Sequence, residues 1–361
     1  MRKLFMFLTV LSSLAGYAQK RHPGNKAIFL EDISWTTAQQ LLTPDAVIVI
    51  PLGAGSKEHG PHLPLSTDYI QANGLAAALA LQRKVIIAPV VNYGFYPAFL
   101  KYPGSTSVDF KTAQDMVVQV VRSLDGYGPK RFYIINVGVS TTPTLVSAAK
   151  VLSEEGILLY YSRNDRAGFE AAKSAFRTKT FDGHADEIET SNIIHLRPDL
   201  VDMSKAVNDS SMKNKKGNMA PIAIEGGSLN ATGIVGYAAL GTKEKGEKSL
   251  ASFAKELVRE IDSVAGCPLP VATDRTAEYS LFEGSYTAAD GKKLLVNQKG
   301  NLLYFIWDGK DNRSFFHLYK DSPDYFSSMA MNMLFVKNTA GLVERAWCQY
   351  RGESFWVTKE K

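Results

Sequence analysis

Residues suited to metal chemistry concentrate in one short segment, residues 51–68, which holds Glu58, His59, His62 and Asp68. Its prolines and glycines keep the segment out of a helix, so its side chains can converge from an irregular loop. Imidazole nitrogen and carboxylate oxygen are ligands for Zn²⁺, Mn²⁺ or Fe²⁺, and a carboxylate such as Asp68 can bridge two such ions. The alternative is a loop with a surface Glu–His pair and a capping aspartate. So many ligand-type residues between prolines favour the metal site.

A second group of chemical side chains lies at residues 182–191 and includes His184, Asp186, Glu187 and Glu189. If a helix starts near His184, its positive N-terminal end favours carboxylates or an anionic substrate group. An acidic first turn that only satisfies the helix dipole would explain Asp186 and Glu187 equally well. It would not explain His184, because a cation at a helix start is unfavourable. These residues alone leave both interpretations open.

The elements that must position these groups form an alternating pattern between residues 27 and 265. Short apolar runs predict buried strands, and segments of helical period separate them. We therefore predict an α/β fold, a three-layer α/β/α sandwich with a mostly parallel sheet. Ligands of such sheets bind beyond the carboxyl ends of the strands, where residues 51–68 lie. The strands are expected at residues 46–51, 85–90, 132–137 and 157–161, and the helices at 71–82, 110–124, 144–152, 184–196 and 244–264.

The C-terminal part of the chain has a different texture. A linker is expected at residues 266–275, and residues 276–361 then hold 16 of the chain's 38 Phe, Trp and Tyr residues. Short apolar runs separated by turn dipeptides predict a small antiparallel β-domain, a barrel or a sandwich. Its aromatic residues fit core packing better than a ligand-binding face.

The first 18 residues have the layout of a secretory signal peptide. Arg2 and Lys3 precede an apolar run at residues 4–14, and small residues lead to a cleavage site after Ala18. The alternative, a membrane anchor, needs about 20 apolar residues, and the run is shorter. We expect a protein that is exported to the periplasm or outside the cell and that has no membrane segment after cleavage.

Charge and cysteine content narrow the partners. The net charge of +5 is not gathered into a basic run, so no nucleic-acid partner is expected. Two cysteines are too few for a disulfide framework or a zinc site built on paired cysteines. Cys267 and Cys348 could pair in an oxidising compartment, and the sequence leaves this open.

The two polar segments together resemble the creatininase (creatinine amidohydrolase) family. The motif KEHGPHLPLSTD, followed about 120 residues later by HADEIETS, is similar to the two signatures of that family. The resemblance implies an α/β/α sandwich, often oligomeric, whose two-metal centre activates water against a small and often cyclic amide. It matches His59 and Asp68 to metal ligands, Glu189 to a carboxylate facing the metals, and His184 to a general acid/base. Glu58 is a weaker match, because the family's ligand glutamate stands two residues before the histidine.

One departure from the family concerns residues 136–141. Gly138 stands where the family usually has a metal-binding histidine, so the centre is expected to hold two ions, one ion or none. Ser140 and Thr141 could contact a polar substrate there, and His62 is expected to orient the metal-binding loop. Asp186 and Glu187 are expected at the edge of the substrate site.

We therefore predict an exported amidohydrolase that hydrolyses a C–N bond of a small amide through a metal-activated water. The alternative is a non-catalytic relative that binds a ligand in the old cleft, because Gly138 removes one ligand. A serine hydrolase using Ser140 is disfavoured, since the glycine that a nucleophile elbow requires two residues later is missing.

Overall fold

The structure is a computed structural model that describes residues 24–163, 167–178, 183–211, 219–220, 228–299, 302–308, 317–320, 324–327, 331–350 and 353–360. The described chain divides into two compact units, and the division falls between Leu269 and Pro270, with Glu154–Gly156 grouped with the second unit. The predicted signal peptide, residues 1–18, lies outside the described residues. No helix of the described chain combines the length and the apolar character that a membrane span requires.

The first unit is built on a five-stranded sheet with the order β1-β3-β2-β4-β5, in which all neighbours are parallel. The central strands are runs of β-branched and aromatic residues buried on both faces, as a covered parallel sheet requires. The strands are β1 (Ile28–Phe29), β2 (Val47–Leu52), β3 (Ile86–Ile87), β4 (Arg131–Asn136) and β5 (Leu158–Tyr161).

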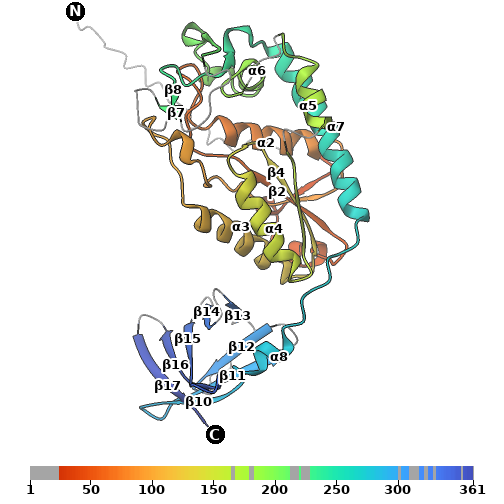
Figure 1. Ribbon diagram of the computed structural model, residues 1–361. Helices are drawn as coiled ribbons and strands as arrows, with labels where there is room; N and C mark the ends of the chain where they lie inside the picture. The colour runs from red at the N-terminus through yellow and green to blue at the C-terminus, as the bar shows by residue number, and fades with distance from the viewer. Residues whose placement is uncertain are drawn as a thin grey trace, which may run out of the picture. The chain divides into compact units, whose positions relative to one another are not determined.

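Helices cover both faces of this sheet (Figure 1). On one face, α2 (Thr67–Ala80) and α7 (Lys243–Gly266) pack in a core with the alternate strand residues Val49 and Tyr133. On the other face, α3 (Phe110–Asp125) and α4 (Thr142–Ser153) pack in a core with Ile48, Phe132 and Ile134. The predicted α/β/α sandwich is therefore confirmed. The remaining helices of this unit are α1 (Trp35–Leu41), α5 (Ala167–Ser174) and α6 (Glu187–Leu196).

The helix predicted from His184 begins three residues later, at Glu187. Asp186 is its N-cap, and its carboxylate accepts the backbone N–H groups of Ile188 and Glu189 at 2.9 and 3.0 Å. The residue before it, Ala185, has a φ of 49°, which lies in the left-handed region and stops the helix from extending backwards. His184 instead forms an isolated antiparallel bridge with Val235.

Several small elements join these parts. They are the strands β6 (Asn208–Asp209) and β9 (Gly236–Tyr237), which pair antiparallel, the strands β7 (Met219–Ala220) and β8 (Ser228–Leu229), which pair parallel, and the short helix α8 (Thr276–Ser280).

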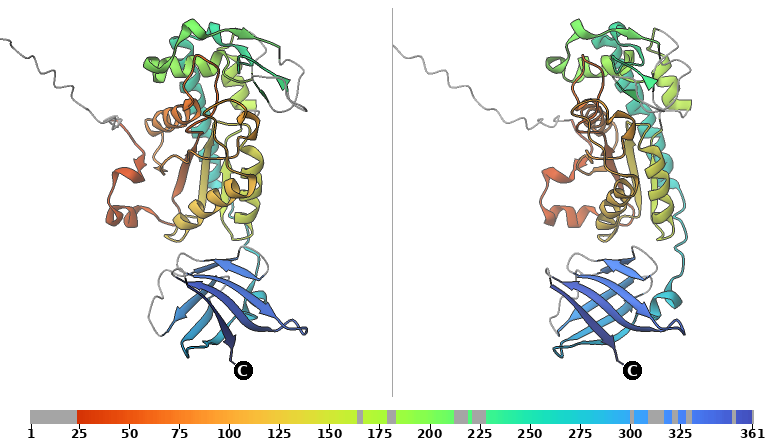
Figure 2. Two further views of the ribbon diagram at one scale, coloured as in Figure 1. Left: turned by 90° about the vertical axis from the view of Figure 1, so that its left-hand side faces the viewer. Right: turned by 60° about the vertical axis from the view of Figure 1, so that its left-hand side comes forward.

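The second unit contains a closed antiparallel barrel, seen in Figure 2 as the blue strands. Aromatic and apolar residues that alternate along the strands, such as Tyr286, Phe305 and Phe335, fill its interior. The predicted β-domain is thus a barrel, and these aromatics form its core. Both cysteines are free: Cys348 lies buried in the barrel and Cys267 lies beyond α7. The strands are β10 (Gly284–Ala288), β11 (Lys293–Lys299), β12 (Leu302–Trp307), β13 (His317–Lys320), β14 (Tyr325–Ser327), β15 (Met331–Lys337), β16 (Val343–Tyr350) and β17 (Glu353–Lys359).

Candidate metal centre

The loop that leaves β2 carries the first group of predicted site residues. It follows the carboxyl end of a central strand and ends in the first turn of α2, where Asp68 is fully buried. His59 is also fully buried, and both of its ring nitrogens face hydrogen-bond acceptors. Nδ1 lies 3.0 Å from the carbonyl oxygen of Lys57, and Nε2 lies 2.9 Å from Oδ1 of Asp68.

The second group arrives from the start of α6. His184 is fixed by its backbone bridge with Val235, and Glu189 lies in the first turn of the helix. Oε2 of Glu189 accepts the backbone N–H of Ala185 at 2.6 Å, so the left-handed residue also anchors this carboxylate. The geometry of this turn therefore directs both His184 and Glu189 into the same space.

The structure brings the two groups together although they lie more than 100 residues apart. Nε2 of His184 lies 2.8 Å from the carbonyl oxygen of Glu58 and 3.0 Å from Oε2 of its carboxylate. The rings of His59 and His184 are 4.7 Å apart. One ligand atom each of His59, His184 and Glu189 lie within 4.8 Å of one another.

These three residues fit one divalent ion. Two imidazoles and one carboxylate form a donor set typical of catalytic zinc, which keeps a further position open for water or substrate. The acceptors beside the rings add to this fit. A metal-binding histidine usually donates its other ring N–H to a carbonyl or carboxylate, and Lys57 and Glu58 offer such acceptors to His59 and His184.

The charges around the cluster are unevenly shared. Burial alone would raise the pKa of Asp68, but the ammonium of Lys57 and the imidazole of His59 outweigh burial and hold this pKa well below its usual range. Burial would likewise raise the pKa of Glu189, but His59 and His184 hold it below its usual range. Both carboxylates are therefore ionised at neutral pH.

Glu58 lies beside the cluster, outside the three-residue set. Its carboxylate accepts the backbone N–H of Gly60 and faces Nε2 of His184. A Cβ atom at Gly233, where φ is +69°, would overlap this carboxylate. Gly233 therefore provides the space in which Glu58 reaches His184.

The other predicted site residues have structural contacts. His62 is buried, and its Nε2 lies 2.8 Å from Oγ1 of Thr190; burial, with a smaller contribution from His59, lowers the pKa of His62 to about 4. Asp186 caps α6 and lies 3.2 Å from the ammonium of Lys173. Glu187 forms a 2.5 Å ion pair with Lys245.

The loop after β4 has the position that the sequence predicted for a missing ligand. A Cβ atom at Gly138 would lie 4.0 Å from Oδ2 of Asp68, so this glycine borders the candidate centre. The hydroxyl of Thr141 donates to Oδ1 of Asn136 at 2.5 Å and contacts the carbonyl of Gly138 at 2.8 Å, which holds the loop closed. Ser140 is half-buried and makes no hydrogen bond to a histidine in the described part of the chain.

Three residues at the site were not predicted. The ammonium of Lys57 lies 2.7 Å from Oδ2 of Asp68, 4.7 Å from the centre of the Phe99 ring and 5.7 Å from that of Tyr96. The Phe99 ring in turn lies 4.6 Å from that of His184. Lysine and aromatic residues are not metal ligands, so a search for ligand types passes over them.

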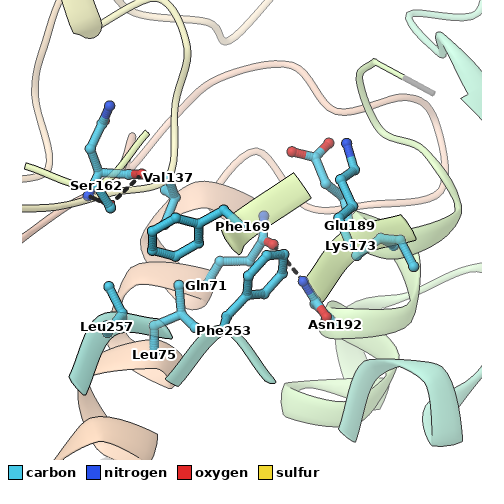
Figure 3. Close-up of a pocket in the computed structure, with 12 residues that line it drawn as sticks. Gln71, Leu75, Val137, Ser162, Phe169, Lys173, Glu189, Asn192, Phe253 and Leu257 are labelled. Carbon is cyan, nitrogen blue, oxygen red and sulfur yellow. Dashed lines mark hydrogen bonds between the residues drawn. The ribbon is translucent and has the colours of Figure 1, made fainter. Parts of the chain in front are cut away.

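A pocket adjoins the centre at Glu189 (Figure 3). Its lower wall is apolar and includes Leu75, Phe169 and Phe253, while Glu189 and Lys173 lie together at its other side. A small molecule with one apolar and one polar part matches this lining.

The fold and the cluster together define a metal-dependent hydrolase of the α/β/α class. The family model described as "Creatininase: Creatinine amidohydrolase" matches residues 31–261, which is more than half of the chain. The chain therefore belongs to the creatininase family, and the resemblance seen in its two motifs is confirmed. The barrel lies outside the matched residues.

Known proteins similar to this chain include two hydrolases. The mycofactocin precursor peptide peptidase of Mycolicibacterium smegmatis is 27% identical over 239 residues, which cover 62% of this chain and 88% of the peptidase. The creatinine amidohydrolase of Pseudomonas putida is 24% identical over 241 residues, covering 62% of this chain and 92% of that enzyme. The predicted hydrolase class is thus confirmed.

Solved structures support the fold. A crystal structure of creatinine amidohydrolase covers 66% of this chain and 98% of its own, with a TM-score of 0.57 and 21% identity. Other creatininase structures of this fold are described as a manganese form and a Zn–Zn form.

Proposed function

We propose that this protein is an exported amidohydrolase that hydrolyses a C–N bond of a small, open or cyclic amide with the help of one bound divalent ion, Zn²⁺, Mn²⁺ or Fe²⁺. The observation that carries the proposal is the convergence of His59, His184 and Glu189 within 4.8 Å. The family supports the reaction type, and the pocket beside Glu189 supports a small substrate.

The bound ion would lower the pKa of a coordinated water to about 7 and so supply a hydroxide near neutral pH. The protein's own part is to prepare the donors. Donation of Nδ1–H from His59 to the Lys57 carbonyl leaves Nε2 as the donor atom. Donation of Nε2–H from His184 to Glu58 leaves Nδ1 directed at Glu189, 4.0 Å from its Oε2.

This geometry changes the role proposed for His184. The sequence assigned it to proton transfer, but Nδ1 lies among the candidate ligand atoms and Nε2 is hydrogen-bonded to Glu58. We therefore favour a ligand role. Asp68 does not carry the proton, because Lys57 and His59 keep it ionised throughout the neutral range.

Metal analysis of the purified protein tests the proposal. We expect about one divalent ion per chain in the wild type, and a loss of at least 10-fold in affinity in His59→Ala, His184→Ala and Glu189→Ala. His195→Ala, on the same helix as Glu189 but outside the cluster, is the matched control. A His184→Ala protein that keeps its metal but loses turnover on a panel of small amides would restore the proton-transfer role.

A wild type that binds no transition metal and cleaves no amide would favour the alternative, a non-catalytic ligand-binding protein. Gly138 is the observation behind this alternative, since it supplies no imidazole beside Asp68. Export has a separate test: mass spectrometry of the protein from the source cells should find an N-terminus just after Ala18. A mature chain that retains residues 1–18 would contradict export by cleavage.

A further inference from the structure

Lys57 is a buried cation beside the candidate metal centre. Its side chain is 5% exposed, and its ammonium lies 2.7 Å from Oδ2 of Asp68. The faces of Phe99 and Tyr96 lie 4.7 and 5.7 Å from the same ammonium. Such rings attract a cation that has lost its water. A carboxylate and two aromatic rings thus form a built site for one positive charge, and Lys57 occupies it.

Both oxygens of Asp68 are engaged in this arrangement. Oδ1 lies 2.9 Å from Nε2 of His59, and Oδ2 lies 2.7 Å from Nζ of Lys57. A carboxylate that bridges two metal ions needs one oxygen for each ion. The ammonium of Lys57 holds the oxygen that a second ion would need.

The neighbouring loop offers no replacement ligand on that side. Gly138 borders Oδ2 of Asp68, and the nearest atoms to a Cβ built there lie at 3.7 Å, an ordinary contact. The space could therefore accommodate a side chain, and the chain supplies none. The absence of an imidazole at Gly138 and the presence of an ammonium at Lys57 both concern the same side of Asp68.

Charge balance points the same way. Three carboxylates, Glu58, Asp68 and Glu189, surround the cluster with one ammonium, that of Lys57, and their side chains are at most 20% exposed. One divalent ion makes these charges neutral when the imidazoles are uncharged. A second ion would leave two surplus positive charges in a buried site, which is strongly unfavourable.

We propose that the ammonium of Lys57 replaces the second divalent ion of this centre, so that the protein binds one ion per chain. The inference rests on the proposed function, since it concerns the same metal site. Lys57 acts here as a positioning residue: it fixes the orientation of Asp68, which in turn faces His59. It is a fixed positive charge that a chelator cannot remove.

The test compares metal stoichiometry in four forms of the full-length protein. Each is stripped with chelator, dialysed against Zn²⁺ or Mn²⁺, and analysed by mass spectrometry of the element against protein concentration. We expect one ion per chain in the wild type and in Gly138→His, because Lys57 still holds Asp68. The double variant Lys57→Glu/Gly138→His supplies a carboxylate and an imidazole on that side and should bind two ions. Lys111→Glu, in an exposed ion pair, is the control for charge reversal and should bind one.

The outcomes separate this inference from the proposed function. A wild type with two ions per chain, or a Gly138→His protein with two, overturns the role of Lys57 and leaves the metal-dependent hydrolase intact. A folded double variant that still binds one ion also overturns it. A wild type with no ion refutes the metal centre itself. Circular dichroism checks folding, and the wild-type count decides even where the double variant does not fold.

Discussion

Replacing Lys57 by methionine is a direct test of how this centre is held together without metal. Methionine keeps most of the length of the side chain and its contact with Phe99 and Tyr96, but it removes the charge. Asp68 is then a fully buried carboxylate whose Oδ2 has lost its cation. Breaking a buried ion pair by removal of one partner typically costs about 3–5 kcal/mol, because the remaining charge is uncompensated.

The expected loss is large enough to measure in the metal-free protein. For a unit of this size, each kcal/mol lowers the melting temperature by about 2–4 °C, so Lys57→Met should lower it by roughly 6–20 °C. Lys111→Met is the matched control, because Lys111 is 63% exposed and pairs with Asp115, which is 42% exposed. Exposed pairs contribute about 0–1 kcal/mol. Urea denaturation with pulsed hydrogen exchange, read on peptides of β2 and β4, confines the measurement to the first unit.

The pH dependence provides a sign that a packing defect would not share. In the wild type the folded pKa of Asp68 lies below the unfolded value of about 4, so the pair stabilises fully above that pH and is lost below it. In Lys57→Met, burial should raise the folded pKa above 4, so falling pH protonates Asp68 and relieves the variant. The stability gap should therefore narrow from pH 7 to pH 4. A gap that stays constant, or that equals the Lys111→Met effect, would refute the ion-pair argument.

Three further outcomes can be measured. Gly233→Ala should weaken divalent-ion binding by about 10–100-fold, because its Cβ would displace Glu58 from the imidazole it orients, whereas Gly291→Ala has a similar positive φ but open space and should show only a backbone cost of about 1–2 kcal/mol; equal metal affinity in both would contradict this. Because burial lowers the pKa of His62 to about 4, its neutral form should contribute about 3 kcal/mol above pH 6.5 that is lost as pH falls to 4, and His62→Gln, which keeps a partner for Thr190, should flatten that part of the stability curve. Chelation should lower the melting temperature of the holoprotein by roughly 5–11 °C where free metal had stood at about 100 times its Kd, and no shift would count against a resident ion.

The fold was accessible from the sequence where hydrophobic pattern decides it. The runs at residues 46–51 and 132–137 became β2 and β4, because central parallel strands are apolar on both faces. Pattern failed where single residues set the geometry. The start of α6 depends on the side chain of Asp186 and on the left-handed φ of Ala185, and neither has a periodic signal.

The site was accessible only in part for a related reason. Ligand types alone pointed to His59, Asp68, His184 and Glu189, which the structure gathers in one place. Spacing along the chain could not tell that Glu58 faces His184, because Gly233 leaves the room for its carboxylate. Such a contact depends on the tertiary fold and has no local pattern.

Lys57 shows why a missing ligand should be judged together with the charges that remain. A buried Asp68 without a partner would be costly, so the loss of an imidazole at Gly138 could not persist unless another cation faced that carboxylate. The ammonium of Lys57 provides that cation from the loop that also carries His59. Its aromatic neighbours, Phe99 and Tyr96, come from a different segment and replace the water that the ammonium has lost. A change at one position alone would leave a buried charge unbalanced, whereas the two together keep Asp68 ionised and paired.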